Sequence, residues 1–254
     1  MKIYLFISIV IVLIYLIYRN IYEYFPYCKD IPIVIISYNN LTFIKNFIDQ
    51  ILKFRNPIII IDNKSTYQPI YEYYNYIKDK LLDKITIHKL NYNYGHTVYL
   101  KRQDLLPSIY ILSDPDLQIN YDMPYNMTEI LLKLSNKYKA YKVGSALDIS
   151  DHEKFINCKN YTEDKSIYDW EIQFWKNPIK NENFELYKAD IDTTFCLVNT
   201  KYKNNLNIRV AGNFTVKHLP WYKDYIKNNV PKDEIDEWKK NNKSSSILFQ
   251  CLKL

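Results

Sequence analysis

Short apolar runs alternate with amphipathic stretches along most of the chain from residue 31 onward. The runs 32–37 and 57–61 lack polar alternation, which is typical of strands buried on both faces of a parallel sheet. The stretches between them carry apolar residues at helical spacing. The expected strands are 32–37, 57–61, 84–90, 108–112, 141–149, 193–198 and 208–210, and the expected helices are 41–54, one ending near 82, 122–138 and 168–176. This order predicts one α/β layer structure with a mainly parallel central sheet flanked by helices.

The first residues show a different pattern. Residues 3–18 are apolar or aromatic apart from Ser8, and as a helix they span about 24 Å, just short of a bilayer crossing. The bulky residues that follow give no small-residue cleavage site. We expect an uncleaved signal anchor over 1–19, a polar stem over 20–30, the α/β domain over 31–222 and a polar C-terminal tail over 223–254. The charges flanking the anchor are balanced, so the orientation in the membrane stays open.

The composition of the chain argues against some classes of function. The 254 residues suffice for one α/β domain or two small domains, and the net charge of +6 is modest. The lysines are scattered rather than clustered, which argues against a nucleic-acid partner but suits an anionic small substrate or an anionic membrane face. The four cysteines show no CxxC spacing, so we expect neither a zinc site nor a disulfide framework, and a reducing compartment is the simpler assumption.

The triplet Asp114-Pro115-Asp116 directly follows the expected strand 108–112. Two carboxylates one residue apart repel each other unless a cation lies beside them. At the carboxyl end of a strand they are suited to bind Mg²⁺ or Mn²⁺ that is itself bound to phosphates. The alternative is a polar Asp-Pro turn after a strand.

Polar and amide groups follow the neighbouring strands at the same edge of the predicted sheet. The residues are Ser37, Tyr38 and Asn39 after the first strand, Asp62 and Asn63 after the second, and Gly95 after the third. We expect Asp62 to accept hydrogen bonds from a nucleobase or ribose, and Gly95 to permit close backbone approach to a ligand. The alternative for each segment is a turn with a helix cap.

These segments resemble glycosyltransferases of the family 2 type, which have the GT-A fold. The matching blocks are residues 35–39, 60–66, 93–95 and 114–116, and one subgroup is also matched by 143–147, 189–195, 209–215 and 218–222. The resemblance spans residues 31–222. It implies a Rossmann-like nucleotide-binding half and a metal-dependent transfer of sugar.

The resemblance also implies roles for individual residues. The first three blocks and Asp114 would bind the nucleotide, whereas Asp114, Asp116 and His218 would hold the cation. The alternative for His218 is a structural histidine packed by Pro220 and Trp221. An imidazole among oxygen ligands favours Mn²⁺ over Mg²⁺. Asp192 is our first choice for the general base, and Asp190 is the alternative. Glu171 either lines an acceptor cleft or is a surface carboxylate on an amphipathic helix.

The implied activity is a non-processive, inverting, hexosyltransferase-like reaction. A single sugar would move from a nucleotide-sugar donor to a hydroxyl of a glycan, protein or lipid acceptor. The Gln-x-x-Arg-Trp motif of processive synthases does not occur in the chain. One alternative is a nucleotidyltransferase of the same fold, disfavoured because residues 37–40 include no Lys or Arg. The other is an inactive binding or scaffold protein with this fold.

Six Asn-x-Ser/Thr sequons occur in the chain, and two of them, at Asn40 and Asn63, lie in the predicted nucleotide loops. A bulky glycan there would block the site. The sequons therefore favour a catalytic domain that faces the cytosol, with a lumenal orientation left open.

Overall fold

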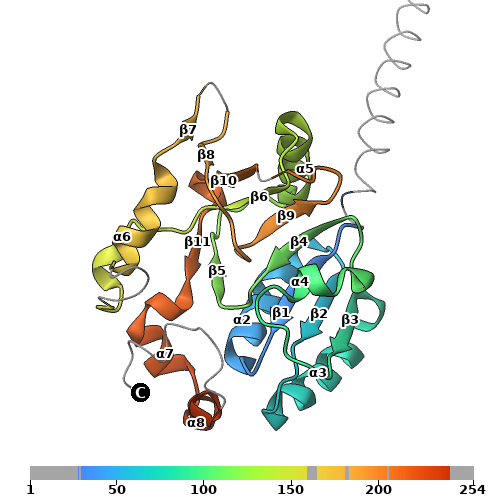
Figure 1. Cartoon of the computed structure of the whole chain (residues 1–254). Helices are drawn as coiled ribbons and strands as arrows, with labels where there is room; N and C mark the ends of the chain where they lie inside the picture. The colour runs from blue at the N-terminus through green and yellow to red at the C-terminus, as the bar shows by residue number, and fades with distance from the viewer. Residues whose placement is uncertain (1–27, 29, 159–164, 181–182, 205, 241–254) are drawn as a thin grey trace, which may run out of the picture.

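A mixed sheet of nine strands forms the centre of the computed structural model, which describes residues 28, 30–158, 165–180, 183–204 and 206–240 (Figure 1). The strand order is β3-β2-β1-β4-β9-β6-β10-β8-β7. The bounds are β1 Ile33–Ser37, β2 Ile58–Asp62, β3 Ile85–Lys89, β4 Ile109–Ser113, β6 Lys142–Ser145, β7 Pro178–Ile179, β8 Leu186–Lys188, β9 Cys196–Asn199 and β10 Asn207–Val210. The first four are parallel, and β9 runs antiparallel between β4 and β6. The predicted α/β class with a mainly parallel sheet is therefore correct, although its second half is mixed.

Helices cover the parallel half on both faces (Figure 1). The helices are α2 Leu41–Ile51, α3 Gln68–Leu81, α4 Val98–Lys101, α5 Met127–Tyr138, α6 Ile167–Glu171, α7 Lys223–Asn229 and α8 Lys232–Lys240. Strand β1 shows why the sequence forms two layers. Ile33 and Ile35 join the core that contains α2, α3 and α5, whereas Val34 and Ile36 join a second core with α4. Successive side chains of a strand point to opposite faces, so an unbroken apolar run requires cover on both sides.

A second, two-stranded antiparallel sheet joins β5 (Leu117–Ile119) to β11 (Val216–His218). It links the segment after β4 with the C-terminal part of the domain. The glycine at position 144 allows the neighbouring strands to approach closely, because an added Cβ would lie 2.2 Å from Cβ of Cys196. No side chain fits there.

Several predicted elements have different bounds in the structure: the strand expected over 193–198 begins at Cys196, and the helix expected over 168–176 ends at Glu171. Two further differences have a visible cause. The helix expected from Asp122 begins at Met127, because the side chain of Asn120 accepts the Asp122 amide and a turn follows. The strand expected over 141–149 leaves the large sheet after Ser145. Leu147 instead bridges to Val216, and the Asp148 amide donates to the Val216 carbonyl.

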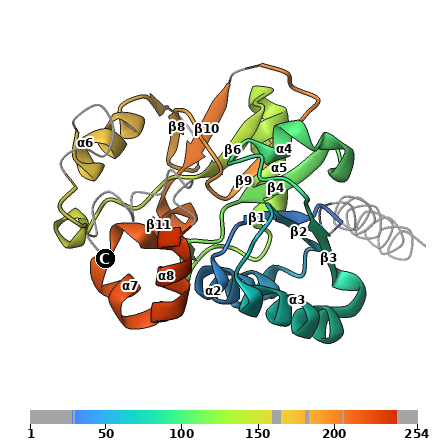
Figure 2. The same ribbon diagram turned by 60° about the horizontal axis from the view of Figure 1, so that its bottom comes forward.

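The C-terminal region is not an unpacked polar tail as far as residue 240. Residues 223–240 form α7 and α8, which lie beside α2 in both Figure 1 and Figure 2. Ile226 and Trp238 are buried in the main core. The expected boundary at residue 222 therefore does not separate these helices from the domain.

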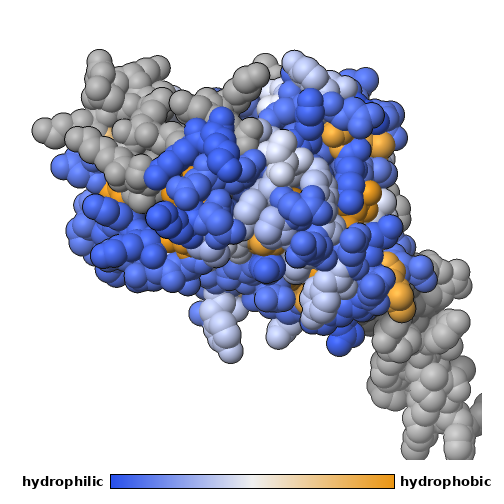
Figure 3. All heavy atoms as spheres, turned by 90° about the horizontal axis from the view of Figure 1, so that it is seen from below, coloured by the Kyte–Doolittle hydropathy of each residue, from blue (hydrophilic) through white to orange (hydrophobic). Residues whose placement is uncertain are grey.

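The described surface is mostly hydrophilic when it is viewed from below the orientation of Figure 1 (Figure 3). Within the described ranges no helix combines the length and apolar character that a bilayer crossing requires. The expected anchor at 1–19 lies outside the described residues. Cys158 is disulfide-bonded, contrary to the expectation of no disulfide, whereas Cys28 and Cys196 are free.

Candidate functional site

The acidic triplet lies at the carboxyl end of β4, as expected, and its first member faces the segment before β9. The Asp114 amide donates to the Thr193 carbonyl at 2.9 Å, and the Thr193 hydroxyl donates to Oδ2 of Asp114. These two contacts fix the carboxylate of Asp114 against residues 190–193. The structure therefore joins two segments that the sequence separates by almost 80 positions.

Asp116 and His218 form a pair through the small second sheet. The β5–β11 register sets His218 opposite Leu117, and the Leu219 amide donates to the Asp116 carbonyl at 2.9 Å. His218 Nε2 consequently lies 3.3 Å from Asp116 Oδ2, with both side chains 22% exposed. Oδ1 of Asp116 and Nδ1 of His218 are buried atoms that have no hydrogen-bond partner in the described structure. Unpartnered ligand atoms of this kind favour a bound cation.

The donor set fits an open metal site rather than a closed one. No cluster of three or more His, Cys, Asp or Glu side chains able to hold a metal occurs among the described residues. Asp114, Asp116 and His218 therefore do not form a complete cage, since Asp114 is turned to Thr193. A divalent ion in phosphate chemistry needs only one or two protein ligands, because phosphate oxygens and water complete the shell. Asp116 and His218 meet that requirement.

Negative charge is in excess around the Asp114 carboxylate. Burial, followed by repulsion from Asp116, raises the pKa of Asp114 well above its ordinary value, and Asp192 adds to the repulsion. The Thr193 hydroxyl and Lys142 oppose the rise only in part. A divalent cation beside these acids would relieve the repulsion.

Lys142 is a functional candidate that the sequence analysis missed. It is 4% exposed, and its Nζ donates to the Tyr99 hydroxyl at 3.1 Å, the Ile191 carbonyl at 3.0 Å and the Asp192 carbonyl at 2.5 Å. Burial alone would lower its pKa, but neighbouring groups including Cys196, Tyr99 and Asp192 raise it above the ordinary value. A buried cation thus holds the backbone of the segment that carries both candidate bases.

The two candidate bases lie in different surroundings. Both side chains are exposed, but only Asp192 appears among the acids that raise the pKa of Asp114. Asp190 lines a separate cavity of about 290 Å³, and its carbonyl accepts from Nε of Arg209 at 2.7 Å. Asp192 therefore interacts electrostatically with Asp114 of the acidic triplet, whereas Asp190 lines the cavity.

Glu171 is neither a surface carboxylate nor a free cleft residue. It is buried and forms an ion pair with Nη1 of Arg209, whose guanidinium also lies over the ring of Phe174 at 4.1 Å. Burial raises the pKa of Glu171, while Arg209 and His218 oppose the rise. The pair links α6 to β10 close to His218. The acidic residue and the arginine are far apart in the sequence, so the pairing was not predictable.

The loops after β1 and β2 are held together by the residues predicted to bind the nucleotide. Asp62 is fully buried, and its two carboxylate oxygens accept from the Ser65 amide at 2.8 Å and the Tyr74 hydroxyl at 2.9 Å. Both carboxylate oxygens of Asp62 thus have partners inside the loop, and the expected contact with a base or ribose stays a prediction.

Three other predicted nucleotide residues have internal partners. Ser37 donates to Asn40 at 2.9 Å and accepts from Tyr74. Asn39, with a left-handed φ of 52°, accepts the Thr66 and Tyr67 amides at 2.7 and 3.0 Å. Asn63 is buried and bonded to Tyr94 and Gly95, so in the folded chain its sequon is inaccessible.

Tyr38 and Gly95 remain accessible at the same edge. Tyr38 is half-buried, and burial is the main cause that raises its pKa, opposed by a hydrogen bond with Asn93. Gly95 is exposed with a φ of 71° and open space where a Cβ would lie. These two positions, rather than Asp62, present surface to a ligand.

Helix α8 lies beside α2 (Figures 1 and 2). It contacts the same loops through acidic side chains. Glu234 accepts the Thr42 amide at 3.0 Å and the Thr42 hydroxyl at 2.6 Å, at the beginning of α2. The Tyr67 hydroxyl donates to Asp233 at 2.5 Å. Nε1 of Trp238 donates to the Asn39 carbonyl. A carboxylate thus occupies the N-terminus of α2, where the helix dipole favours an anion.

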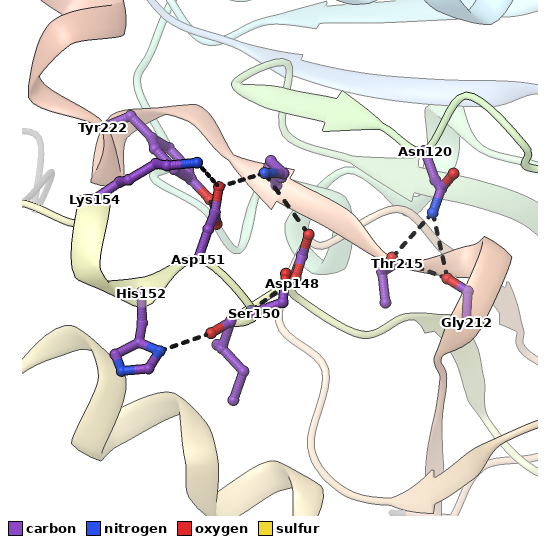
Figure 4. Close-up of polar contacts among 11 residues, drawn as sticks. Asn120, Asp148, Ser150, Asp151, His152, Lys154, Gly212, Thr215 and Tyr222 are labelled. Carbon is purple, nitrogen blue, oxygen red and sulfur yellow. Dashed lines mark hydrogen bonds and ion pairs between the residues drawn. The ribbon is translucent and has the colours of Figure 1, made fainter.

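A polar cluster around Asp151 lies beside β11, the strand that carries His218 (Figure 4). Nζ of Lys217 donates to Oδ2 of Asp151 at 2.6 Å, and the Tyr222 hydroxyl donates to Oδ1 at 2.7 Å. Burial pushes the pKa of Asp151 upward, but these hydrogen bonds bring it below its ordinary value. The cluster ties the β11 strand to the residues after β6.

Comparisons with known proteins support the fold. No family model matches the chain, and no curated protein matches it. A solved structure of GalNAc-T7 with UDP, GalNAc and Mn²⁺ aligns over 87% of this chain and 56% of its own, with 10% identity and a TM-score of 0.50. The chain therefore has a GT-A-like fold and spans little more than half of that relative.

Two further matches have lower TM-scores. The HddC protein from Yersinia pseudotuberculosis, complexed with GMP-PN, aligns over 83% of this chain and 99% of its own, at 11% identity and a TM-score of 0.45. A mannosyltransferase from Pyrobaculum calidifontis, in complex with GDP-Man and Mn²⁺, aligns over 48% and 37%, at 14% identity and a TM-score of 0.39.

Proposed function

We propose that the chain is a metal-dependent glycosyltransferase that moves a single sugar from a nucleotide-sugar donor to an acceptor hydroxyl, with inversion. One observation carries the proposal. Asp116 and His218 lie at the carboxyl edge of a GT-A-like sheet, 3.3 Å apart, and each keeps a buried ligand atom without a partner. The imidazole favours Mn²⁺ over Mg²⁺.

The bound cation would supply positive charge to the diphosphate as the leaving group departs. Asp116 and His218 would hold it, and Asp114, fixed by Thr193, would add negative charge beside it. Tyr38 and Gly95 are the accessible groups for the nucleoside. None of these roles requires Asp62, whose oxygens are used inside the loop.

Asp192 is the proposed general base, and it would take the acceptor hydroxyl proton during attack on the anomeric carbon. Its exposed carboxylate interacts electrostatically with Asp114, and Lys142 fixes its carbonyl. Asp190 is better suited to bind the acceptor than to act as the base, because it lines the cavity.

Nucleotidyl transfer by the same fold is the second candidate, and the loop after β1 disfavours it. Residues 37–40 include no cation, and Glu234 fills the N-terminus of α2, where a triphosphate would otherwise gain from the helix dipole. A carboxylate at that point repels an anion instead.

We also propose that residues 1–19 anchor the enzyme in a membrane as a single span. The apolar run Ile3–Tyr18 supports this role. The acceptor would then be a glycan, protein or lipid near the membrane surface. Transfer of the run to a reporter protein tests the proposal: the reporter should sediment with membranes and resist alkaline extraction.

A thermal-shift screen tests the function. The detergent-solubilised full chain is heated with nucleotide sugars, with and without Mn²⁺, alongside Asp116→Asn and the matched control Asp79→Asn on the outer face of α3. We expect one donor to raise the melting temperature only with Mn²⁺, in the wild type and in the control. Equal stabilisation of Asp116→Asn would contradict the metal assignment, and no stabilisation by any donor would contradict the function.

A further inference from the structure

A cavity of about 290 Å³ lies between residues 173–177, which follow α6, and the strands β8 and β10, next to the segment that carries the candidate bases. We infer that it is the acceptor subsite and binds one saccharide unit through its hydroxyl groups. The inference rests on the proposed glycosyl transfer and adds the acceptor's chemical class to it. Seven residues line the cavity: Gln173, Phe174, Asn177, Lys188, Ala189, Asp190 and Asn207.

The lining has the chemistry that a sugar requires. Three amides, one carboxylate and one ammonium group surround an aromatic ring, and each hydroxyl of a sugar both donates and accepts. The single carboxylate and single ammonium balance in charge, so the cavity offers no preference for an anionic ligand. Its volume of about 290 Å³ lies just below the range of about 300–1,000 Å³ for drug-sized ligands, which suits one ring rather than a chain.

Asn207 provides an unmet hydrogen-bonding group in this lining. Its Oδ1 is buried and lacks a partner in the described structure, and its Nδ2 makes only a long contact of 3.5 Å to Asp190. Buried amide oxygens are normally satisfied, and leaving one unpaired costs free energy. A ligand hydroxyl in the cavity would satisfy Oδ1.

The wall of the cavity is fixed by charged contacts. The Arg209 guanidinium covers one face of Phe174 at 4.1 Å and pairs with buried Glu171. Arg209 also donates to the Asp190 carbonyl. One arginine therefore positions both the ring and the carboxylate-bearing backbone, so the subsite exists before a ligand binds.

The cavity and the proposed reaction centre share one short segment of the chain. Asp190 lines it, and Asp192, the proposed base, is two residues further on, at most about 7 Å along the backbone. That separation is comparable to the width of a sugar ring. A unit held by Asp190 and Asn207 would present a hydroxyl towards Asp192.

Ligand-observed saturation-transfer NMR on the full chain tests the inference. The probes are the methyl glycosides of glucose, galactose, mannose and N-acetylglucosamine. We expect at least one to receive saturation from the wild type, with about tenfold weaker binding to Asn207→Ala, which lacks one hydrogen-bonding amide. Phe174→Leu should weaken binding as well. Asn136→Ala, an exposed asparagine on α5, is the matched control and should bind as the wild type does.

Each outcome decides the inference. No saturation transfer to any glycoside, or equal transfer in Asn207→Ala and the wild type, would overturn it. Should Phe174→Leu fail to fold, Asn207→Ala still decides. Glycoside binding without stabilisation by any nucleotide sugar would leave the subsite standing and remove the proposed function. Donor stabilisation without glycoside binding would remove the subsite alone.

Discussion

Replacement of Lys142 by methionine tests how the site is held. Methionine preserves most of the volume of the side chain but removes the cation. The carbonyls of Ile191 and Asp192 then lose their donor in a region from which water is excluded. Each buried carbonyl left without a partner lowers the free energy of unfolding by about 1–3 kcal/mol. Part of this loss is offset, because the variant no longer has to bury a charged ammonium group.

We estimate a net loss of about 3 kcal/mol in the free energy of unfolding of Lys142→Met. For a chain of this size, that corresponds to a fall of about 6–12 °C in melting temperature. Denaturant unfolding followed by circular dichroism measures the free energy, and a transfer assay measures the activity. Activity should fall more than the folded fraction does, because the segment bearing Asp192 is released.

Lys78→Met is the matched control, since Lys78 is exposed on α3 and removal of its charge should change stability by less than about 0.5 kcal/mol. The reasoning is refuted if Lys142→Met unfolds at the same denaturant concentration as Lys78→Met. Retention of full transfer activity would refute the positioning role separately.

Three further perturbations address other parts of the account. Gly144→Ala should be destabilised by about 3 kcal/mol or fail to fold, because its Cβ would lie 2.2 Å from Cβ of Cys196; soluble yield and melting temperature check this. Glu234→Gln should lose about 1 kcal/mol in denaturant unfolding, because the charge at the N-terminus of α2 is removed. Without divalent ions, Asp114→Asn should become more stable relative to the wild type as the pH rises above about 4. The pKa of Asp114 is higher in the folded state than in the unfolded state, so the wild-type protein loses free energy of unfolding as this carboxyl ionises, and the asparagine variant does not. A constant difference in melting temperature across pH would contradict this last point.

Local pattern was enough to predict the parallel half of the fold. The apolar runs at 33–37, 58–62 and 109–113 are buried on both faces, and α2 has the helical spacing seen in the sequence. Helix α8 was missed because it has only two buried residues, Glu234 and Trp238, and binds through acidic groups. A segment with so few apolar residues has the composition of a polar tail, and the loops that α8 contacts are not known from the sequence.

The site was predictable in its positions but not in its contacts. The acidic triplet lies at the carboxyl end of β4 and His218 lies beside it, as the resemblance implied. The internal partner of Asp62, the Tyr74 hydroxyl, was not predictable, because a carboxylate at a strand end binds either a ligand or its own loop. Lys142 lies in the segment 141–149, which was predicted only as a strand, and a cation buried by carbonyl groups has no signature in a single sequence.

The central claim is that Asp116 and His218 bind the cation at the diphosphate. Pulsed electron paramagnetic resonance of Mn²⁺ bound to the full chain with a nucleoside diphosphate tests it directly. The account predicts a nitrogen hyperfine coupling from one directly coordinated imidazole, retained in His152→Gln and lost in His218→Gln. A bound Mn²⁺ without such coupling, or with coupling that persists in His218→Gln, would contradict the account.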